Sequence, residues 1–190
     1  MTVLIIGLIL FLGSHSVSIV APAWRDRAAA RMGEIPWQAL YSLTAVAGFV
    51  LIIKGYGGTQ HDTVSLYIPP HGLHAPAVLL QVVVFPLLLA TYLPGRIKTA
   101  VGHPMLTATM LWALAHLLVN GAIVNVVLFG AFLVWAVVDR ISMGYRVQRP
   151  LPSAPPSKWN DAIAVVGGLG IYAAFLLGAH RWLFGVSPLG

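Results

Sequence analysis

The sequence predicts an all-α fold: a polytopic membrane helical bundle of about six transmembrane helices with both termini outside. Three observations lead to this class. Only 8% of the 190 residues are charged and 58% are hydrophobic, whereas an ordinary soluble domain has about 25% charged residues. The hydrophobic residues gather in blocks long enough for a helix to cross a bilayer. The basic residues concentrate in alternate connections between these blocks, which indicates the orientation of the chain.

The apolar blocks are the expected membrane spans. The first has no basic residues before it and is longer than the apolar core of about 7–15 residues in a signal peptide, so we interpret it as a retained helix. The segment RDRAAARMGE after it predicts a short interfacial helix that Gly33 ends ahead of Pro36. The expected spans cover residues 2–20, 37–56, 75–93, 104–119, 122–138 and 162–184.

Lysines and arginines distinguish the two sides of the membrane. The side reached by the second and fourth connections has only Lys54 and Arg181. Because Lys and Arg accumulate in cytoplasmic loops, we expect the first, third and fifth connections inside and both termini outside. Those three connections contain Arg25, Arg27, Arg31, Arg96, Lys98, Arg140, Arg146, Arg149 and Lys158.

The connections also predict the domain organisation. Between His103 and Asp139 the chain must cross twice within about 55 Å of helix, so a tight turn is needed. The dipeptide Asn120-Gly121, whose residues tolerate positive φ, predicts that turn and an antiparallel hairpin. We expect a five-span body over residues 1–145, a proline-rich cytoplasmic linker over 146–160 and a C-terminal transmembrane helix over 161–190. The small residues VVGGLGIYAA of this helix predict close helix packing.

Composition excludes several kinds of chemistry. The net charge is +6, but the basic residues lie between apolar blocks and form no continuous patch, so we expect membrane lipids and no nucleic acid as partners. Without cysteine, histidine is the strongest available ligand for a transition metal. No carboxylate lies within a span, so acid–base chemistry in the bilayer would depend on histidine. Asp139-Arg140 is interpreted as a solvated or locally paired anchor.

His15 and His116 each lie inside an apolar span. An imidazole among lipid tails costs free energy unless it faces a partner, so both are candidate functional residues. Helical rise places each within about 5 Å of the bilayer midplane, on opposite sides of it. Two such histidines on separate helices can clamp a haem iron within a bundle. Alternatively, each is a helix-packing group bonded to a serine or a backbone carbonyl.

Neighbouring side chains suit a buried flat cofactor. Trp112, His116 and Asn120 share one helix face at i, i+4 spacing. Ser14 is adjacent to His15, where a hydroxyl can orient the imidazole. His15 and His116 differ in depth by about 10 Å, so His103, at the cytoplasmic mouth of its span, is the alternative partner of His15.

The remaining histidines lie outside the apolar cores. The outward loop TQHDTVSLYIPPHGLHAP contains His61, His71 and His74 with Asp62, and we interpret it as solvated in preference to a metal site. His180 lies near the outer end of the last span, beside Arg181 and Trp182. We interpret it as an interfacial anchor.

Four segments carry a family resemblance that covers most of residues 1–140. They are GLILFLGSHSVSIVAPAWRD, GEIPWQALYSLTAVAGFVLIIKGYG, YLPGRIKTAVGHPMLTATMLWALAHLLVNG and FGAFLVWAVVDR. With its LGSHS, GHP and AHLLVNG motifs, the sequence resembles the NnrU family of bacterial membrane proteins. The resemblance implies a multi-pass protein of the bacterial inner membrane that is associated with denitrification and nitric oxide metabolism, with nitric oxide reductase or other denitrification proteins as partners.

The same motifs are similar, more distantly, to cis-zeta-carotene isomerase, a haem b enzyme. Its two iron-ligating histidines match His15 and His116, and its HP motif matches His103. This implies haem b as the cofactor and redox or isomerase-type chemistry. GHPMLTATML is also similar to the RHP segment of membrane methyltransferases that bind S-adenosylmethionine, although Gly102 replaces the arginine.

Three function hypotheses therefore stand side by side. The first is a haem b protein with His15 and His116 as axial ligands. The alternative is a cofactor-free assembly or maturation factor for nitric oxide reductase, in which the histidines pack helices. A membrane methyltransferase-like protein is third.

Overall fold

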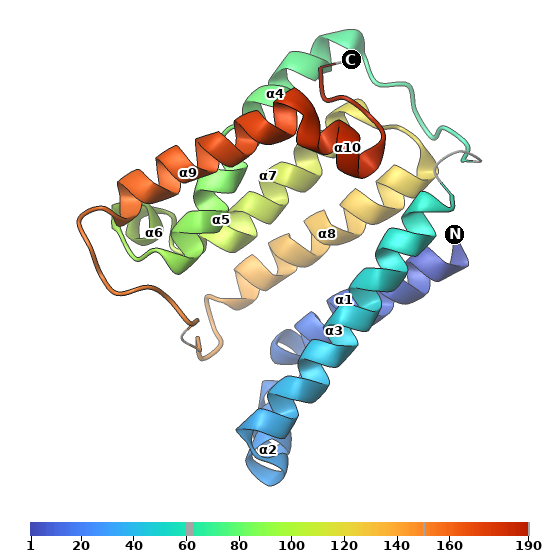
Figure 1. Ribbon diagram of the computed structural model, residues 1–190. Coiled ribbons are helices and arrows are strands. Elements are labelled where there is room, and N and C mark those ends of the chain that lie inside the picture. Colours follow the sequence, from blue (N-terminus) through green and yellow to red (C-terminus); the bar gives the residue numbers. More distant parts are fainter. Residues whose placement is uncertain (60–62, 150, 190) are drawn as a thin grey trace. The chain divides into compact units, whose positions relative to one another are not determined.

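The computed structural model describes residues 1–59, 63–149 and 151–189, and confirms the all-α class. The described residues contain one isolated antiparallel bridge, between Ser65 and Ala122. The helices are α1 (Thr2–Val20), α2 (Pro22–Met32), α3 (Glu34–Gly57), α4 (His74–Gln81), α5 (Val84–Tyr92), α6 (Arg96–Val101), α7 (Pro104–Val119), α8 (Ile123–Ser142), α9 (Asn160–Ala174) and α10 (His180–Phe184), with a 3-10 turn at His71–Leu73 and a π-helical turn at Phe175–Ala179 (Figure 1).

Among the described residues, five helical stretches are long and apolar enough to cross a membrane, which makes the chain a multi-pass membrane protein. Helix α7, where a sixth span was expected, has 16 residues. At about 1.5 Å per residue it is shorter than a hydrocarbon core of about 30 Å. The count of six and the side of the termini therefore stay predictions. The five stretches are Thr2–Val20, Glu34–Gly57, His71–Tyr92, Ile123–Ser142 and Asn160–Phe184.

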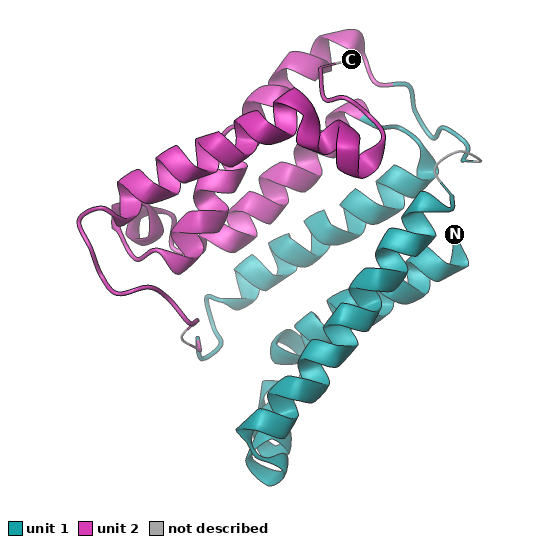
Figure 2. Ribbon diagram, viewed as in Figure 1, with its two compact units in different colours: residues 1–68, 120–148 teal, residues 69–119, 149–190 magenta. Residues whose placement is uncertain are grey.

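The helices divide into two compact units (Figure 2). Unit 1 comprises residues 1–68 and 120–148, with α1, α2, α3 and α8. Unit 2 comprises residues 69–119 and 149–190, with α4 to α7, α9 and α10. Each unit thus joins segments that are distant in the sequence. The expected division into a body over residues 1–145, a linker over 146–160 and a last helix over 161–190 stays a prediction.

Glycines bring α1 and α3 of unit 1 into backbone contact along their length (Figure 1). A Cβ added to Gly7 would lie 2.6 Å from the backbone nitrogen of Ile52. A Cβ added to Gly48 would lie 2.6 Å from the backbone nitrogen of Phe11. Small residues allow such an approach in membranes, where helix association depends on close packing. This packing fixes α1, and with it His15, against α3.

The connection between α7 and α8 is the short turn that was expected, and it covers residues 120–122. Neither Asn120 nor Gly121 adopts a positive φ in it. The carbonyl of Gly121 instead accepts hydrogen bonds from the backbone nitrogens of Leu66, at 2.7 Å, and Tyr67, at 3.3 Å. A side chain on Gly121 would collide with the Tyr67 carbonyl. Pairing with a distant segment therefore shapes this connection and requires its glycine.

In unit 2, the predicted close packing of the last membrane helix is confirmed. A Cβ on Gly168 of α9 would lie 2.6 Å from Pro86 Cα of α5. The Tyr172 hydroxyl donates to the Val78 carbonyl at 3.0 Å, which ties α9 to α4.

The short helix predicted after the first span is also present, as α2 of unit 1. It ends at Met32, and Gly33 follows with φ 87°.

Asp161 joins the start of α9 to the short helix α6. Its carboxylate accepts hydrogen bonds from the backbone nitrogens of Arg96, at 2.8 Å, and Ile97, at 3.1 Å. These are amides of the first turn of α6, which lack a partner within the helix. The neighbouring Asn160 amide donates to the carbonyls of Pro94, at 2.8 Å, and Pro155, at 3.1 Å. The adjacent side chains of Asn160 and Asp161 therefore connect the start of α9 to the segment that contains Arg96 and Lys98.

We expect Asp161→Ala to lower stability by about 1 kcal/mol, the usual effect of losing a helix-capping side chain. For a chain of this size that is a fall in Tm of about 3 °C. Thermal unfolding in detergent, followed by tryptophan fluorescence, measures it. Asp26→Ala is the control, because Asp26 forms an exposed pair with Arg25 and such pairs contribute little. Equal shifts in both variants would contradict the capping role.

Candidate functional site

His15 of α1 is held by its own helix. Its Nδ1 lies 2.6 Å from the carbonyl oxygen of Phe11, one turn earlier. A carbonyl only accepts, so Nδ1 carries the proton and the neutral ring presents its lone pair at Nε2. The Ser14 hydroxyl donates to the same carbonyl at 2.8 Å and lies 3.4 Å from His15 Nδ1. The predicted contact of Ser14 with His15 is therefore present.

Aromatic side chains from three helices surround the His15 ring within unit 1. Ring centroids lie 4.4 Å away for Phe11, 5.2 Å for Tyr41 of α3 and 5.8 Å for Trp135 of α8. The indole Nε1 of Trp135 is buried and has no hydrogen-bond acceptor in the described part of the chain. A buried donor without an acceptor is costly unless another group supplies one. The His15 surroundings thus combine flat apolar walls with one unsatisfied donor.

His116 of α7, in unit 2, repeats the arrangement. Its Nδ1 lies 2.8 Å from the Trp112 carbonyl, again four residues earlier. The Gln81 Nε2 of α4 lies 3.1 Å from the same nitrogen. The Trp112 carbonyl requires the proton on Nδ1, and the Gln81 contact then requires the amide to be turned so that its oxygen accepts. The Trp112 ring centroid lies 5.3 Å from that of His116, so the predicted pair shares a face.

His180 contacts His116, which its interpretation as an interfacial anchor missed. The two ring centroids are 6.4 Å apart, with 23° between the ring planes. His180 Nδ1 donates to the carbonyl of Val186 at 2.8 Å. The next residues, Arg181 and Trp182, are exposed, and Trp182 retains 83% of its accessible surface. Within the segment predicted to be an interfacial anchor, Arg181 and Trp182 are exposed, whereas His180 is half-buried.

Two predicted members of the site lie at the ends of α7. Helix α7 ends at Val119, so Asn120 lies just beyond it, and its place on the face of Trp112 and His116 stays a prediction. The chain leaves the helix there because Gly121 pairs with residues 66 and 67, and the Asn120 carbonyl accepts from the Tyr67 hydroxyl at 3.1 Å. His103 precedes α7, and its carbonyl accepts from Thr107 in the first turn.

In the outward loop, His61 and Asp62 lie outside the described residues. His71 begins the 3-10 turn and His74 begins α4. Across residues 1–59, 63–149 and 151–189, no group of three or more His, Asp or Glu side chains is placed to hold a metal ion.

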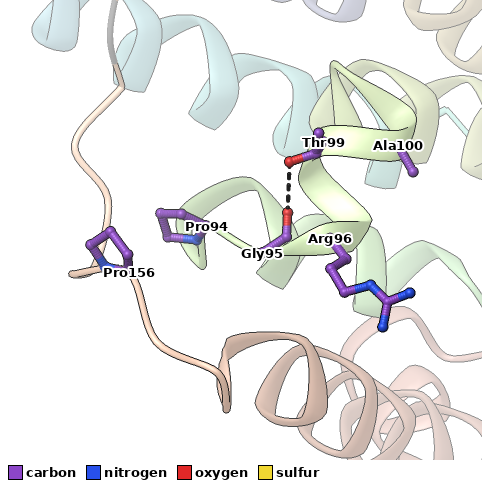
Figure 3. Close-up of a pocket in the computed structure, with 6 residues that line it drawn as sticks. All are labelled: Pro94, Gly95, Arg96, Thr99, Ala100 and Pro156. Atoms are coloured by element: carbon purple, nitrogen blue, oxygen red, sulfur yellow. Dashed lines mark hydrogen bonds between the residues drawn. The ribbon is translucent and has the colours of Figure 1, made fainter.

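A shallow depression of about 560 Å³ lies beside the α5–α6 turn of unit 2 (Figure 3). Within it, the Thr99 hydroxyl donates to the Gly95 carbonyl at 3.1 Å. Its lining contains no histidine, so it is separate from the imidazole sites. The lining residues are Pro94, Gly95, Arg96, Thr99, Ala100 and Pro156.

The long apolar helices and their imidazoles define a multi-pass helical membrane protein. The family model described as NnrU protein matches residues 3–188, and the chain therefore belongs to the NnrU family. The predicted resemblance is confirmed, and the match extends through α10. No match was found among curated proteins or among solved structures.

Proposed function

We propose that this NnrU-family protein of the bacterial inner membrane binds haem b, which His15 and His116 would hold. The supporting observation is that Nδ1 of each ring lies at hydrogen-bond distance from the carbonyl four residues earlier, at 2.6 Å for His15 and 2.8 Å for His116. A carbonyl only accepts, so the proton belongs on Nδ1, and Nε2 is then the nitrogen with the chemistry of a metal ligand. A metal-ligating histidine usually has its other nitrogen tied to a carbonyl or carboxylate in this way.

The residues around His15 fit a haem group chemically. Phe11, Tyr41 and Trp135 offer flat apolar surfaces. The buried Trp135 Nε1–H suits a polar group of the cofactor, such as a carboxylate, as its missing acceptor. When bound, haem would supply an iron that changes redox state and binds small ligands such as nitric oxide. The protein's own part is to orient the imidazoles and to exclude water.

The topology belongs to the same proposal. Six crossings, with α7 as the shortest, place both termini outside and the basic connections inside. The charge distribution supports this, since nine of the eleven Lys and Arg residues lie in the three inner connections. The role in denitrification and nitric oxide metabolism is the one that family membership suggests.

The second candidate is a cofactor-free assembly or maturation factor for nitric oxide reductase. One observation favours it. The Nδ1 bonds of His15 and His116 are made within their own helices, and their rings pack on aromatic residues of the same unit. Helix-packing histidines have the same features.

Visible spectroscopy separates the two candidates. We expect protein purified in mild detergent, from cells with ample haem, to show a Soret band and the spectrum of six-coordinate low-spin iron. His116→Ala and His15→Ala should each lose the low-spin bands, because each removes one of the two imidazoles. His74→Ala is the control, because His74 is exposed at the start of α4. His180 cannot serve as one, since its ring contacts His116.

Two results would reject the haem proposal. Protein without a Soret band binds no haem, and the assembly factor would then be favoured. Unchanged spectra and potentials in both His15→Ala and His116→Ala would exclude these residues as ligands even if haem stays bound.

A further inference from the structure

A shallow groove of about 280 Å³ follows the last turns of α1 and reaches the start of α2, within unit 1. From Gly13 to Val20 it extends along α1 for about 10 Å, at about 1.5 Å per residue. It therefore lies on a membrane-spanning helix and ends where the chain leaves the apolar span. The lining residues are Gly13, Ser16, Val17, Val20, Ala21 and Trp24.

The walls of this groove are apolar. The one hydroxyl in its lining, that of Ser16, donates to the Leu12 carbonyl at 2.6 Å, so its hydrogen bond stays within α1. Gly13 contributes no side chain, and a Cβ built on it meets nothing within 4 Å. Because the hydrocarbon core of a bilayer contains no water, an apolar hollow on a span is filled there by lipid chains. The groove thus fits an acyl chain.

Trp24 lines the end of the groove and is fixed by a neighbouring helix. Its ring centroid lies 6.0 Å from that of Trp37 of α3, with 71° between the ring planes. The Arg25 guanidinium lies 5.7 Å from the Trp37 ring centroid and pairs with Asp26 at 3.1 Å. Tryptophan prefers the headgroup level of a membrane. The end of the groove therefore lies at that level, and the charge of Arg25 is already compensated by the protein.

Two further arginines continue the groove along α2. Trp24, Arg27 and Arg31 follow each other at i, i+3, i+7 spacing, so they share one face of this helix. Arg27 and Arg31 are exposed, and neither forms an ion pair within residues 1–59, 63–149 and 151–189. The face of α2 that follows the apolar groove thus carries two positive charges without an acidic partner.

We propose that this groove is a specific site for one anionic phospholipid. One acyl chain lies beside Gly13, the glycerol region contacts Trp24, and Arg27 and Arg31 bind the phosphate group. Guanidinium groups form charge-assisted hydrogen bonds with phosphate oxygens. The two arginines favour a lipid with a net negative charge over a zwitterionic lipid. No histidine lines the groove, so the inference does not depend on haem binding.

Native mass spectrometry of the full-length protein in mild detergent tests the site. Phosphatidylglycerol and phosphatidylcholine with the same acyl chains are added in separate titrations. We expect the wild type to bind one phosphatidylglycerol at a lower lipid concentration than any phosphatidylcholine. Arg27→Gln/Arg31→Gln should weaken phosphatidylglycerol binding by about 25-fold, or roughly fivefold for each arginine, and should leave phosphatidylcholine binding unchanged.

A matched double variant controls for net charge. Arg96→Gln/Lys158→Gln removes the same charge from two exposed residues of unit 2. It should therefore bind phosphatidylglycerol as the wild type does.

A variant that fills the groove supplies an independent arm. Gly13→Leu places a side chain where the acyl chain would lie, and the open space at Gly13 accommodates it. We expect the tight phosphatidylglycerol site to be lost. Gly170→Leu in α9 is the control, because a Cβ at Gly170 also meets nothing within 4 Å. This variant should keep the site.

Several results would overturn the lipid site. Equal affinity of the wild type for the two lipids would show that the headgroup is not selected. Unchanged phosphatidylglycerol binding in the double arginine variant or in Gly13→Leu would exclude the arginines or the groove. Competition by glycerol phosphate, which has no acyl chains, would assign the arginines to a soluble anion. A dimer that Gly13→Leu dissociates would make a second copy of the chain the occupant of the groove.

Discussion

Gly48→Ala is expected to unfold about 4–8 °C below the wild-type protein, the fall that corresponds to a loss of about 2 kcal/mol in a chain of this size. Two effects oppose each other. Alanine has the higher helix propensity, which favours the variant by about 1 kcal/mol. The new Cβ, however, would lie 2.6 Å from the Phe11 backbone nitrogen and 3.0 Å from the Gly7 carbonyl oxygen. Backbone atoms cannot rotate away, so α1 and α3 must separate, and this cost exceeds the gain.

Gly13→Ala makes the sign of this prediction testable. Gly13 is also a helix residue, in α1, but a Cβ there meets nothing within 4 Å. Only the propensity term remains, so this variant should be as stable as the wild type or slightly more stable. Thermal unfolding in the same detergent compares the two. A loss in Gly13→Ala as large as in Gly48→Ala would show that alanine itself, and not the helix contact, is responsible.

The same variant connects the fold to the site. The backbone of Phe11 packs directly against Gly48. The carbonyl of the same Phe11 lies at hydrogen-bond distance from His15 Nδ1. Displacement of α1 at this turn would change the surroundings of the imidazole as well as the stability of unit 1. Under the proposed haem function, Gly48→Ala should therefore shift the reduction potential, whereas Gly13→Ala should not.

Local sequence signals predicted the helices well because their causes are local. Apolar length fixed the spans, and Gly33 before Pro36 marked the end of α2. The short turn at Asn120-Gly121 was predicted too, but its backbone conformation, which has no positive φ, was not. There the backbone conformation depends on hydrogen bonds to residues 66 and 67, which no local pattern contains.

In the candidate site too, residues with a local sequence signal were predicted and residues brought in from other helices were not. His15 and His116 were identifiable because an imidazole in an apolar run is conspicuous by itself. Tyr41, Trp135 and Gln81, which contact these rings, come from other helices, and only the folded chain brings them there. His180 had one overlooked signal: Gly185, placed just after a short apolar segment, is typical of a helix end that turns the chain back.

Arg146→Ala is expected to be about as damaging as the glycine variant or more so. Asp139 at the end of α8 is 6% exposed, so the predicted solvated anchor is wrong, although the prediction of a local pair holds. Its partner is Arg146 and not the adjacent Arg140: the guanidinium lies 2.5 Å from the carboxylate, to which the Ser142 hydroxyl also donates at 3.1 Å. Removing one member of a buried pair leaves a charge without compensation, which costs about 3 kcal/mol or more.

A second variant distinguishes whether Arg146→Ala lowers stability through the unpaired Asp139 charge or through lost packing contacts. Because the cost of Arg146→Ala comes from the stranded Asp139 carboxylate, neutralising that carboxylate should recover stability. We expect Asp139→Asn/Arg146→Ala to unfold at a higher temperature than Arg146→Ala alone. Arg140→Ala is the matched control, since Arg140 is exposed and outside this pair. If the double variant were less stable than Arg146→Ala, the arginine would act through packing, and the buried charge at the end of α8 would not be what it stabilises.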